Sequence, residues 1–142
     1  MKQRDDIWCI EIIKAKTAAS ERIVPLHQTI IEQGFTDFVK TRDGERLFGE
    51  KGTSKEGLIK RLRRWLHSID NLNLGHTQGL APNHAWRHWI KRAATDVGIE
   101  DRTIDAIVGH APATVGAKYG GVSLLAMKTA LDKIPVPRAK PG

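Results

Sequence analysis

The spacing of apolar residues predicts a β-hairpin near the start of the chain. Residues 7–14 alternate with a period of two and present one mostly apolar face. After a short link, residues 20–25 resume the extended pattern and end at Pro25, which suits the end of a strand. We therefore expect two antiparallel strands joined by a tip that carries Lys16.

The rest of the chain has the 3.6-residue spacing of amphipathic helices. Helices are expected over residues 27–40, 55–69 and 84–97, in a short segment capped by Asp101, and over 124–134, with polar loops at 41–54 and 70–82. Gly34 is a weak point of the first helix, and Gly98 is a good terminator of the third. Asn83 and Ser123 are candidate N-caps because their side chains can accept from free backbone N–H groups.

Together these elements predict an α+β fold over residues 1–134, mainly helical, with a small antiparallel hairpin (7–25) packed on a helical body (27–134). A chain of 142 residues is long enough to bury one core. Residues 135–142 are expected to form a flexible tail. No apolar run is long enough for a transmembrane helix, and no apolar segment typical of a secretory signal follows the first residues. The one cysteine, Cys9, fits a reducing cytoplasm.

The charge balance favours a polyanionic partner. The formal net charge is +7 and the isoelectric point is about 9.8. Four basic residues cluster on the helix expected at 55–69, namely Lys60, Arg61, Arg63 and Arg64. They form either a solvated face or a surface that contacts the DNA backbone without reading sequence.

Four residues in the second half of the chain suggest phosphate chemistry. His84 and Arg87 are three apart and so share a helix face, while His110 follows Gly109 and precedes Tyr119 by nine residues. A guanidinium and two imidazoles can hold a phosphate, and a phenol can attack it. The phenol has an ordinary pKa of about 10, so it needs a base or a cationic environment to react at neutral pH.

These residues resemble the catalytic domain of the tyrosine recombinases, the phage integrase family. The family signature is His-x-x-Arg, then Leu-Gly-His or a close variant, then a tyrosine nine residues later; here the middle element reads Val108-Gly109-His110. The segment Lys16-Thr17…Ser20-x-Arg22-x-Val24-Pro25-Leu26-His27 looks like the phage-type hairpin of that family. The resemblance covers about residues 5–134 and implies a DNA breaking-rejoining fold.

The resemblance also implies a mechanism of site-specific DNA recombination and integration. Tyr119 would attack a DNA phosphate to give a 3′-phosphotyrosine, Arg87 and His110 would donate to the phosphate, and His84 would accept the tyrosine proton or donate to the phosphate. Lys16 would protonate the leaving 5′-oxygen. Neither a metal nor ATP is expected, because side chains supply the charge and the intermediate keeps the bond energy.

One element of the family pattern has no match. The family has a first arginine, in a Gly-x-Arg-x-x-Glu pattern, before an Asp-Ile pair that Asp6-Ile7 resembles, whereas Arg4 lies too close to the strand and lacks the pattern. We therefore expect a C-terminal catalytic fragment of an integrase in the bacterial cytoplasm: an engineered fragment, the product of a truncated gene or a prophage remnant, between which the sequence does not choose. It is expected to fold, to be monomeric and to be inactive alone, whereas the full-length protein would form a tetramer on the double-stranded DNA of its attachment sites.

Three alternatives stay open. The chain could be a non-catalytic DNA-binding remnant, or a metal hydrolase that uses His84, His88 and His110, although Arg87 between the first two argues against a metal. Lys14 is a rival to Lys16. The tryptophans are expected in the core rather than stacked on bases, in particular Trp65, Trp86 and Trp89.

Overall fold

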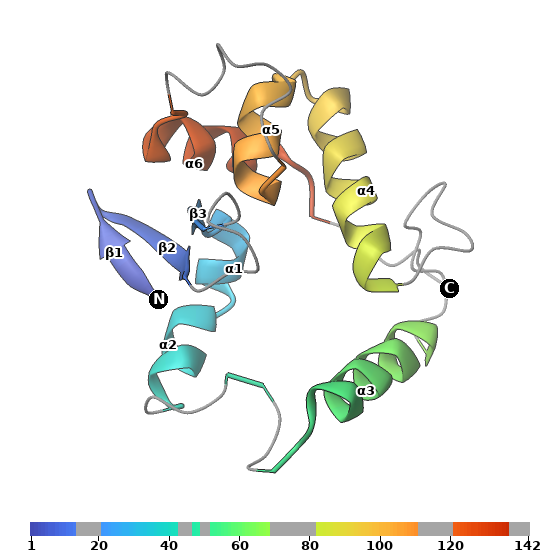
Figure 1. The fold of residues 1–142 in the computed structure, drawn as a ribbon. Coiled ribbons are helices and arrows are strands. Elements are labelled where there is room, and N and C mark those ends of the chain that lie inside the picture. The colour runs from blue at the N-terminus through green and yellow to red at the C-terminus, as the bar shows by residue number, and fades with distance from the viewer. Residues whose placement is uncertain (14–20, 43–46, 49–51, 69–81, 111–120, 137–142) are drawn as a thin grey trace. The chain divides into compact units, whose positions relative to one another are not determined.

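The computed structural model describes residues 1–13, 21–42, 47–48, 52–68, 82–110 and 121–136, and side chains are described outside 66–68 and 82–84. Its elements are β1 (Lys2–Arg4), β2 (Ile7–Ile12), β3 (Arg22–Pro25), α1 (Gln28–Glu32), α2 (Phe35–Lys40), α3 (Lys55–Ser68), α4 (Pro82–Asp96), α5 (Asp101–Val108) and α6 (Leu124–Lys133) (Figure 1). The chain is thus mixed α+β with a small antiparallel sheet, as its apolar pattern predicts.

The chain divides into two compact units. Unit 1 comprises Met1–Gln33 and Ile90–Pro135, and unit 2 comprises Gly34–Trp89 and Val136–Gly142. Unit 1 holds the sheet with α1, α5, α6 and the second half of α4, while unit 2 holds α2, α3 and the first half of α4. None of the helices in the described segments has both the length and the apolar character needed to cross a membrane.

The predicted hairpin is confirmed. Strands β2 and β3 pair antiparallel, from Cys9 opposite Pro25 to Ile12 opposite Arg22. Strand β2 ends at Ile12, and the tip that carries Lys16 lies outside the described residues. The sheet order is β1-β2-β3.

Strand β1 is an addition that the apolar pattern did not predict. Its residues are all exposed, so burial left no period-two signal in this segment. Asp5 and Asp6 form the turn to β2, with φ of 47° and 60°, and Arg4 pairs with Ile7 across it. Positive φ at both central residues is the geometry of a two-residue hairpin loop, which aspartate tolerates better than most residues.

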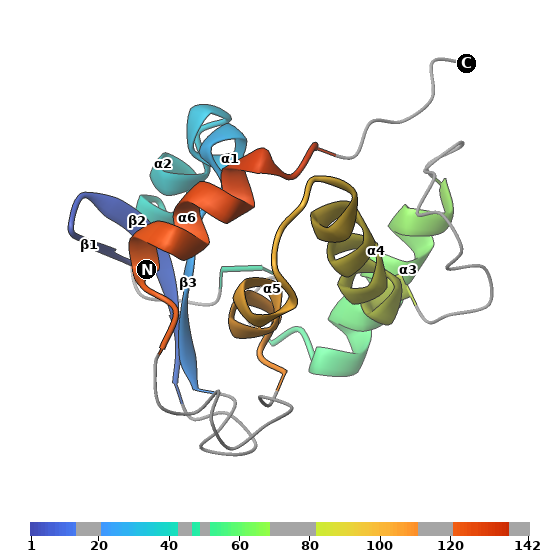
Figure 2. The same ribbon diagram turned by 90° about the horizontal axis from the view of Figure 1, so that it is seen from above.

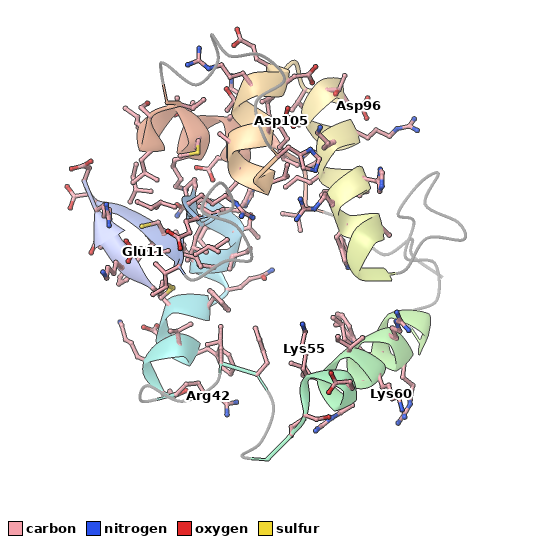
Figure 3. The ribbon with its side chains drawn as sticks, viewed as in Figure 1. Glu11, Arg42, Lys55, Lys60, Asp96 and Asp105 are labelled. Atoms are coloured by element: carbon pink, nitrogen blue, oxygen red, sulfur yellow. The ribbon has the colours of Figure 1, made fainter. Side chains whose placement is uncertain are left out.

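Ion pairs also hold β1 on β2. Glu11 accepts from Lys2 Nζ at 2.8 Å and from Arg4 Nη2 at 2.6 Å (Glu11 is labelled in Figure 3). The hydrogen bond and charge of Lys2, with Arg4 beside it, hold the pKa of Glu11 below its ordinary value of 4.5. Because folding lowers the pKa of Glu11, the two ion pairs stabilise the fold fully above pH 4.5. This stabilisation is lost as the pH falls through the lowered pKa of Glu11.

The core of unit 1 lies between the sheet and the two C-terminal helices. Helix α6 packs on β3 and β2, and α5 packs on β3 and α6 (Figure 2). The buried apolar residues of this unit are Ile7, Cys9, Pro25, Leu26, Ala93, Ala94, Ile104, Ile107, Val108, Met127, Leu131 and Ile134. The short helix expected after residue 100 is therefore present as α5, with Ile104, Ile107 and Val108 buried.

Histidine 27 joins the start of α1 to the end of α6. Its Nδ1 accepts from the backbone N–H of Thr29 at 3.1 Å, and its Nε2 lies 3.1 Å from the carbonyl oxygen of Ile134. A carbonyl only accepts, so the ring proton sits on Nε2. Gln28 N–H also donates to Asp132 at 2.9 Å.

The prediction of one helix over 27–40 is wrong, because Gly34 breaks it. Helix α1 ends at Glu32 and α2 begins at Phe35, with Gly34 between them in the left-handed conformation at φ 81°. Glycine adopts this conformation without the steric cost that a Cβ would bring, so the weak point becomes a boundary.

Two predicted helix starts are displaced. Helix α4 begins at Pro82, not after an Asn83 cap, and proline suits a first turn because its missing N–H would have no helical partner. The N-cap of α5 is Glu100, so Asp101 lies in the first turn, where its charge favours the helix dipole. Ser123 does cap α6, accepting from Ala126 N–H at 3.1 Å.

The tryptophans of unit 2 are less buried than expected. Trp65 is 57% exposed, so its assignment to the core is wrong. It lines a shallow apolar groove of about 340 Å³ with Phe48 and Leu62, and these neighbours leave much of its ring open. Trp86 and Trp89 are half-buried and pack edge to face at 6.2 Å.

We predict that Ile104→Ala lowers the free energy of unfolding by about 2–5 kcal/mol, because it opens a cavity at a position only 1% exposed. Leu125→Ala is the matched control, since Leu125 is 67% exposed, and it should change stability by less than about 0.5 kcal/mol. Urea denaturation followed by circular dichroism measures both. Equal losses would show that this core is misplaced.

Candidate functional site

The structure describes part of the predicted site. The side chains of Arg87 and His110 are described, and His84 lies on α4 with its side chain outside the described set. Lys16 and Tyr119 lie outside the described residues. Arg87 belongs to unit 2 and His110 to unit 1, so each is considered within its own unit.

The end of α5 fixes the position of His110. Gly109 is left-handed at φ 76°, which ends the helix and turns the chain. The carbonyl of Asp105 accepts from the N–H of Gly109 at 2.8 Å and from the N–H of His110 at 3.0 Å. His110 therefore leaves the helix in one defined direction, which explains why glycine precedes it.

Arg22 ties the hairpin to the same turn. Its Nε donates to the carbonyl of Ile107 at 3.0 Å, so it satisfies one of the free acceptors at the helix end. A Cβ on Gly109 would lie 2.5 Å from the Arg22 guanidinium carbon, so any other residue there would displace the end of the Arg22 side chain. Arg22 pairs with Ile12 in the last pair of β2 and β3, next to the segment that contains Lys16. This end of the hairpin is therefore held at the turn that precedes His110.

A charged cluster surrounds the His110 ring. Lys91, on α4, places Nζ 2.8 Å from Asp105 Oδ1 and 3.1 Å from His110 Nδ1, and the Asp105 oxygen lies 3.3 Å from the same nitrogen. Asp105 is labelled on α5 in Figure 3. Its Oδ1 is closed to solvent and makes no well-aligned hydrogen bond, so the ammonium at ion-pair distance compensates its charge.

An open pocket of about 480 Å³ lies beside these groups in unit 1. It is lined by Arg22, Ile23, Asp105, Ala106, Gly109, His110, Gly121, Val122, Leu124 and Met127. His110 and Gly121 are the described residues on either side of the segment 111–120, which contains Tyr119. Arg22 is the second residue after the segment that contains Lys16. The described flanks of both segments therefore meet at one pocket.

Arg87 lies one helical turn before Lys91 on α4, so the two occupy the same stripe of that helix. His84 precedes Arg87 by three residues and continues the stripe by sequence spacing. The Arg87 side chain is half-buried. By their spacing, Arg87 and Lys91 therefore lie along one side of α4.

The predicted basic surface lies on α3. Lys60, Arg63 and Arg64 are exposed and share one side of the helix by their spacing (Lys60 is labelled in Figure 3). Arg61 is also exposed, but its guanidinium donates to Thr53 at 3.1 Å and it borders the apolar groove. The four residues therefore divide into a stripe of three and one that is held locally.

A metal site is not built by the described part of the chain. No group of three or more His, Cys, Asp or Glu residues there is arranged to hold an ion. The side chain of His84, which the hydrolase alternative needs, is outside that part.

Sequence reasoning missed Lys91 and Asp105 as part of the site, and it used Arg22 only as a hairpin marker. Lys91 had a detectable signal, because it follows Arg87 by one helical turn. Asp105 had a weaker one. It precedes His110 by five residues, which is the spacing at which a helix carbonyl closes a glycine turn.

Comparisons with protein-family models, with curated proteins and with solved structures found no match for this chain.

We predict that Gly109→Ala destabilises the protein more than Gly98→Ala. Both glycines have positive φ, which costs about 1–2 kcal/mol for alanine, but only Gly109 faces the Arg22 guanidinium, whereas Gly98 faces open space. Displacing Arg22 would also break its bond to Ile107, adding about 1 kcal/mol. Urea denaturation of both variants measures the difference.

A double-mutant cycle with Arg22→Ala isolates the cause. In that background the extra cost of Gly109→Ala should vanish, because the guanidinium is gone. An unchanged cost would mean that Arg22 does not press on Gly109.

Proposed function

We propose that this chain is the catalytic part of a phage-type tyrosine recombinase, which cuts and rejoins double-stranded DNA through Tyr119. One observation carries the proposal: Arg22, His110 and Gly121 line one pocket, and they flank the segments that contain Lys16 and Tyr119. These two segments would supply the nucleophile and the general acid to one phosphate bound at this pocket.

The proposed reaction is a transesterification. The Tyr119 oxygen attacks the DNA phosphorus while the bond from phosphorus to the 5′-oxygen breaks. The phenolic proton passes to His84, and Lys16 donates a proton to the leaving oxygen. The products are a 3′-phosphotyrosine and a free 5′-hydroxyl, and attack by a 5′-hydroxyl reverses the step to join strands.

The remaining groups stabilise the charge that develops on the phosphate. Arg87 offers a planar fork of donors, and His110 offers a ring donor at the pocket. In such sites one preorganised donor typically contributes about 10²–10³ in rate. The proposal includes no metal or nucleotide cofactor, since these side chains carry the charge.

The stripe of Lys60, Arg63 and Arg64 is the proposed contact with the DNA backbone. Its side chains are exposed and cationic, and they suit phosphates better than base edges. We place the reaction in the cytoplasm of a bacterium, on attachment-site DNA, with four copies of the full-length protein assembled there and the chain monomeric without DNA.

The first test is the nucleophile. Tyr119→Phe keeps the ring but removes the attacking oxygen, so it should abolish the covalent adduct while leaving DNA affinity within about twofold. The protein is incubated with a pool of nicked random-sequence duplexes, and adducts are resolved on a denaturing gel. The assay uses the whole protein that the gene encodes, because the family resemblance implies a further arginine that has no match in this chain.

An adduct that persists in Tyr119→Phe would refute the assignment. A wild-type protein that binds DNA but forms no adduct would instead support the non-catalytic DNA-binding alternative.

The second test is the basic stripe. Lys60→Ala/Arg64→Ala should weaken DNA binding on all sequences alike and lower the salt dependence, reducing the slope of log affinity against log salt by about 2. Fluorescence anisotropy at several salt concentrations measures this.

The matched control is Lys40→Ala/Arg42→Ala, which removes the same charge from exposed positions of the same unit (Arg42 is labelled in Figure 3). It should leave the slope unchanged. Equal effects of the two pairs would mean that net charge, and not the stripe on α3, drives binding.

A further inference from the structure

Lys91 and Asp105 contact His110, but neither has a role in the proposed mechanism. Lys91 Nζ lies 3.1 Å from His110 Nδ1, and Asp105 Oδ1 lies 3.3 Å from the same atom. The backbone N–H of His110 is also bonded to the Asp105 carbonyl, so ring and backbone are both held by residue 105. All three groups belong to unit 1.

Lys91 and Asp105, the two neighbours of Nδ1, favour opposite tautomers of the neutral His110 ring. An ammonium has donors only, so a hydrogen bond from Lys91 requires Nδ1 to be the acceptor, and a neutral ring then carries its proton on Nε2. A carboxylate has acceptors only, so a bond to Asp105 would place the proton on Nδ1 and leave Nε2 without it. The ring cannot satisfy both as a neutral group.

The geometry favours Lys91. Its contact with Nδ1 is the shorter of the two, at 3.1 Å against 3.3 Å. Asp105 Oδ1 is already engaged by the same ammonium at 2.8 Å and is closed to solvent. Lys91 can serve both groups, because its charge compensates the carboxylate at ion-pair distance while one of its N–H donors faces the ring.

We propose that Lys91 is a positioning residue, which, held by Asp105, keeps His110 in the Nε2–H tautomer. His110 then presents a donor at the pocket, and its ring is not available as a base through Nε2. This inference rests on the proposed function for its consequence: in the phosphate site His110 donates to an oxygen, and the proton of Tyr119 must go elsewhere.

Asp105 has a second effect in this arrangement. An uncompensated carboxylate at the pocket would repel a phosphate, and Lys91 neutralises it. The pair therefore orients the donor without adding negative charge to the anion site.

The tautomer can be measured without DNA. Nitrogen-15 NMR of the 142-residue chain, labelled in its six histidines, reports which ring nitrogen bears the proton. The measurement is made near pH 8.5, where an ordinary imidazole is about 99% neutral. His110→Gln identifies the signal, and His27 is an internal reference, because its Nδ1 accepts from a backbone N–H.

In the wild-type chain we expect the Nε2–H form. Lys91→Met should switch His110 to the Nδ1–H form, because Asp105 becomes the only partner of Nδ1 in the cluster. Lys91→Arg should retain the wild-type form, since a guanidinium also has donors only. Arg92→Met, an exposed cation on the same helix, should change nothing. A wild-type Nδ1–H form, or a Lys91→Met variant that keeps Nε2–H, would overturn the proposal.

Two features keep the test decisive. The wild-type measurement stands even if Lys91→Met fails to fold with an unpaired carboxylate. Lys91→Met/Asp105→Leu removes both charges, which proteins tolerate better than removing one, and it should leave the ring exchanging between tautomers.

An activity arm separates this inference from the proposed function. In the adduct assay, Lys91→Met should slow covalent attachment by about tenfold to a hundredfold and Lys91→Arg by less than about threefold, because disorienting a donor costs at most what removing it does. The expected tautomers without any adduct would leave the inference standing and reject the function. Adduct formation by a protein whose His110 carries its proton on Nδ1 would reject the inference and leave the proposed function standing.

Discussion

The closure of α5 on the carbonyl of Asp105 is the constraint on which the site depends. One acceptor takes the N–H groups of Gly109 and His110, and the left-handed glycine makes this possible. The same turn leaves the Ile107 carbonyl for Arg22, and a side chain at Gly109 would displace the Arg22 guanidinium. A helix end, a sheet strand and a candidate catalytic histidine are therefore fixed by a single backbone geometry.

Charge reinforces that geometry. One carboxylate oxygen of Asp105, Oδ1, is closed to solvent, where an uncompensated charge would be costly, and Lys91 from α4 compensates it. Such pairs add little net stability against apolar replacements, but they specify one arrangement of their partners. Here the partners include His110, so a pair that contributes little to folding can decide which ring nitrogen carries the proton.

The sequence predicted the elements better than their ends. The period of two located β2 and β3, and the helical stripes located α3, α5 and α6, because burial leaves a periodic record. Strand β1 left none, since its residues are exposed and its turn depends on two aspartates with positive φ. For the site, the sequence predicted relations between residues on one helix, such as the position of Arg87. The contacts of Lys91 and Asp105 with His110 were not predicted, because they join two helices.

The proposed phosphate chemistry would need several groups in place at once. Reactive groups must meet a phosphate within about 0.5 Å of their productive geometry, which favours donors on rigid elements. The backbone and ring contacts of His110 hold it at the end of a helix, as the proposed function would require of a donor. The segments that contain Lys16 and Tyr119 have described flanks at the same pocket, at Arg22, His110 and Gly121. Because Arg22 and His110 both depend on the turn at Gly109, a change there would displace a fixed donor and the flanks of both segments together. Gly109 therefore supports the proposed site as directly as His110 does, because its turn holds both Arg22 and His110.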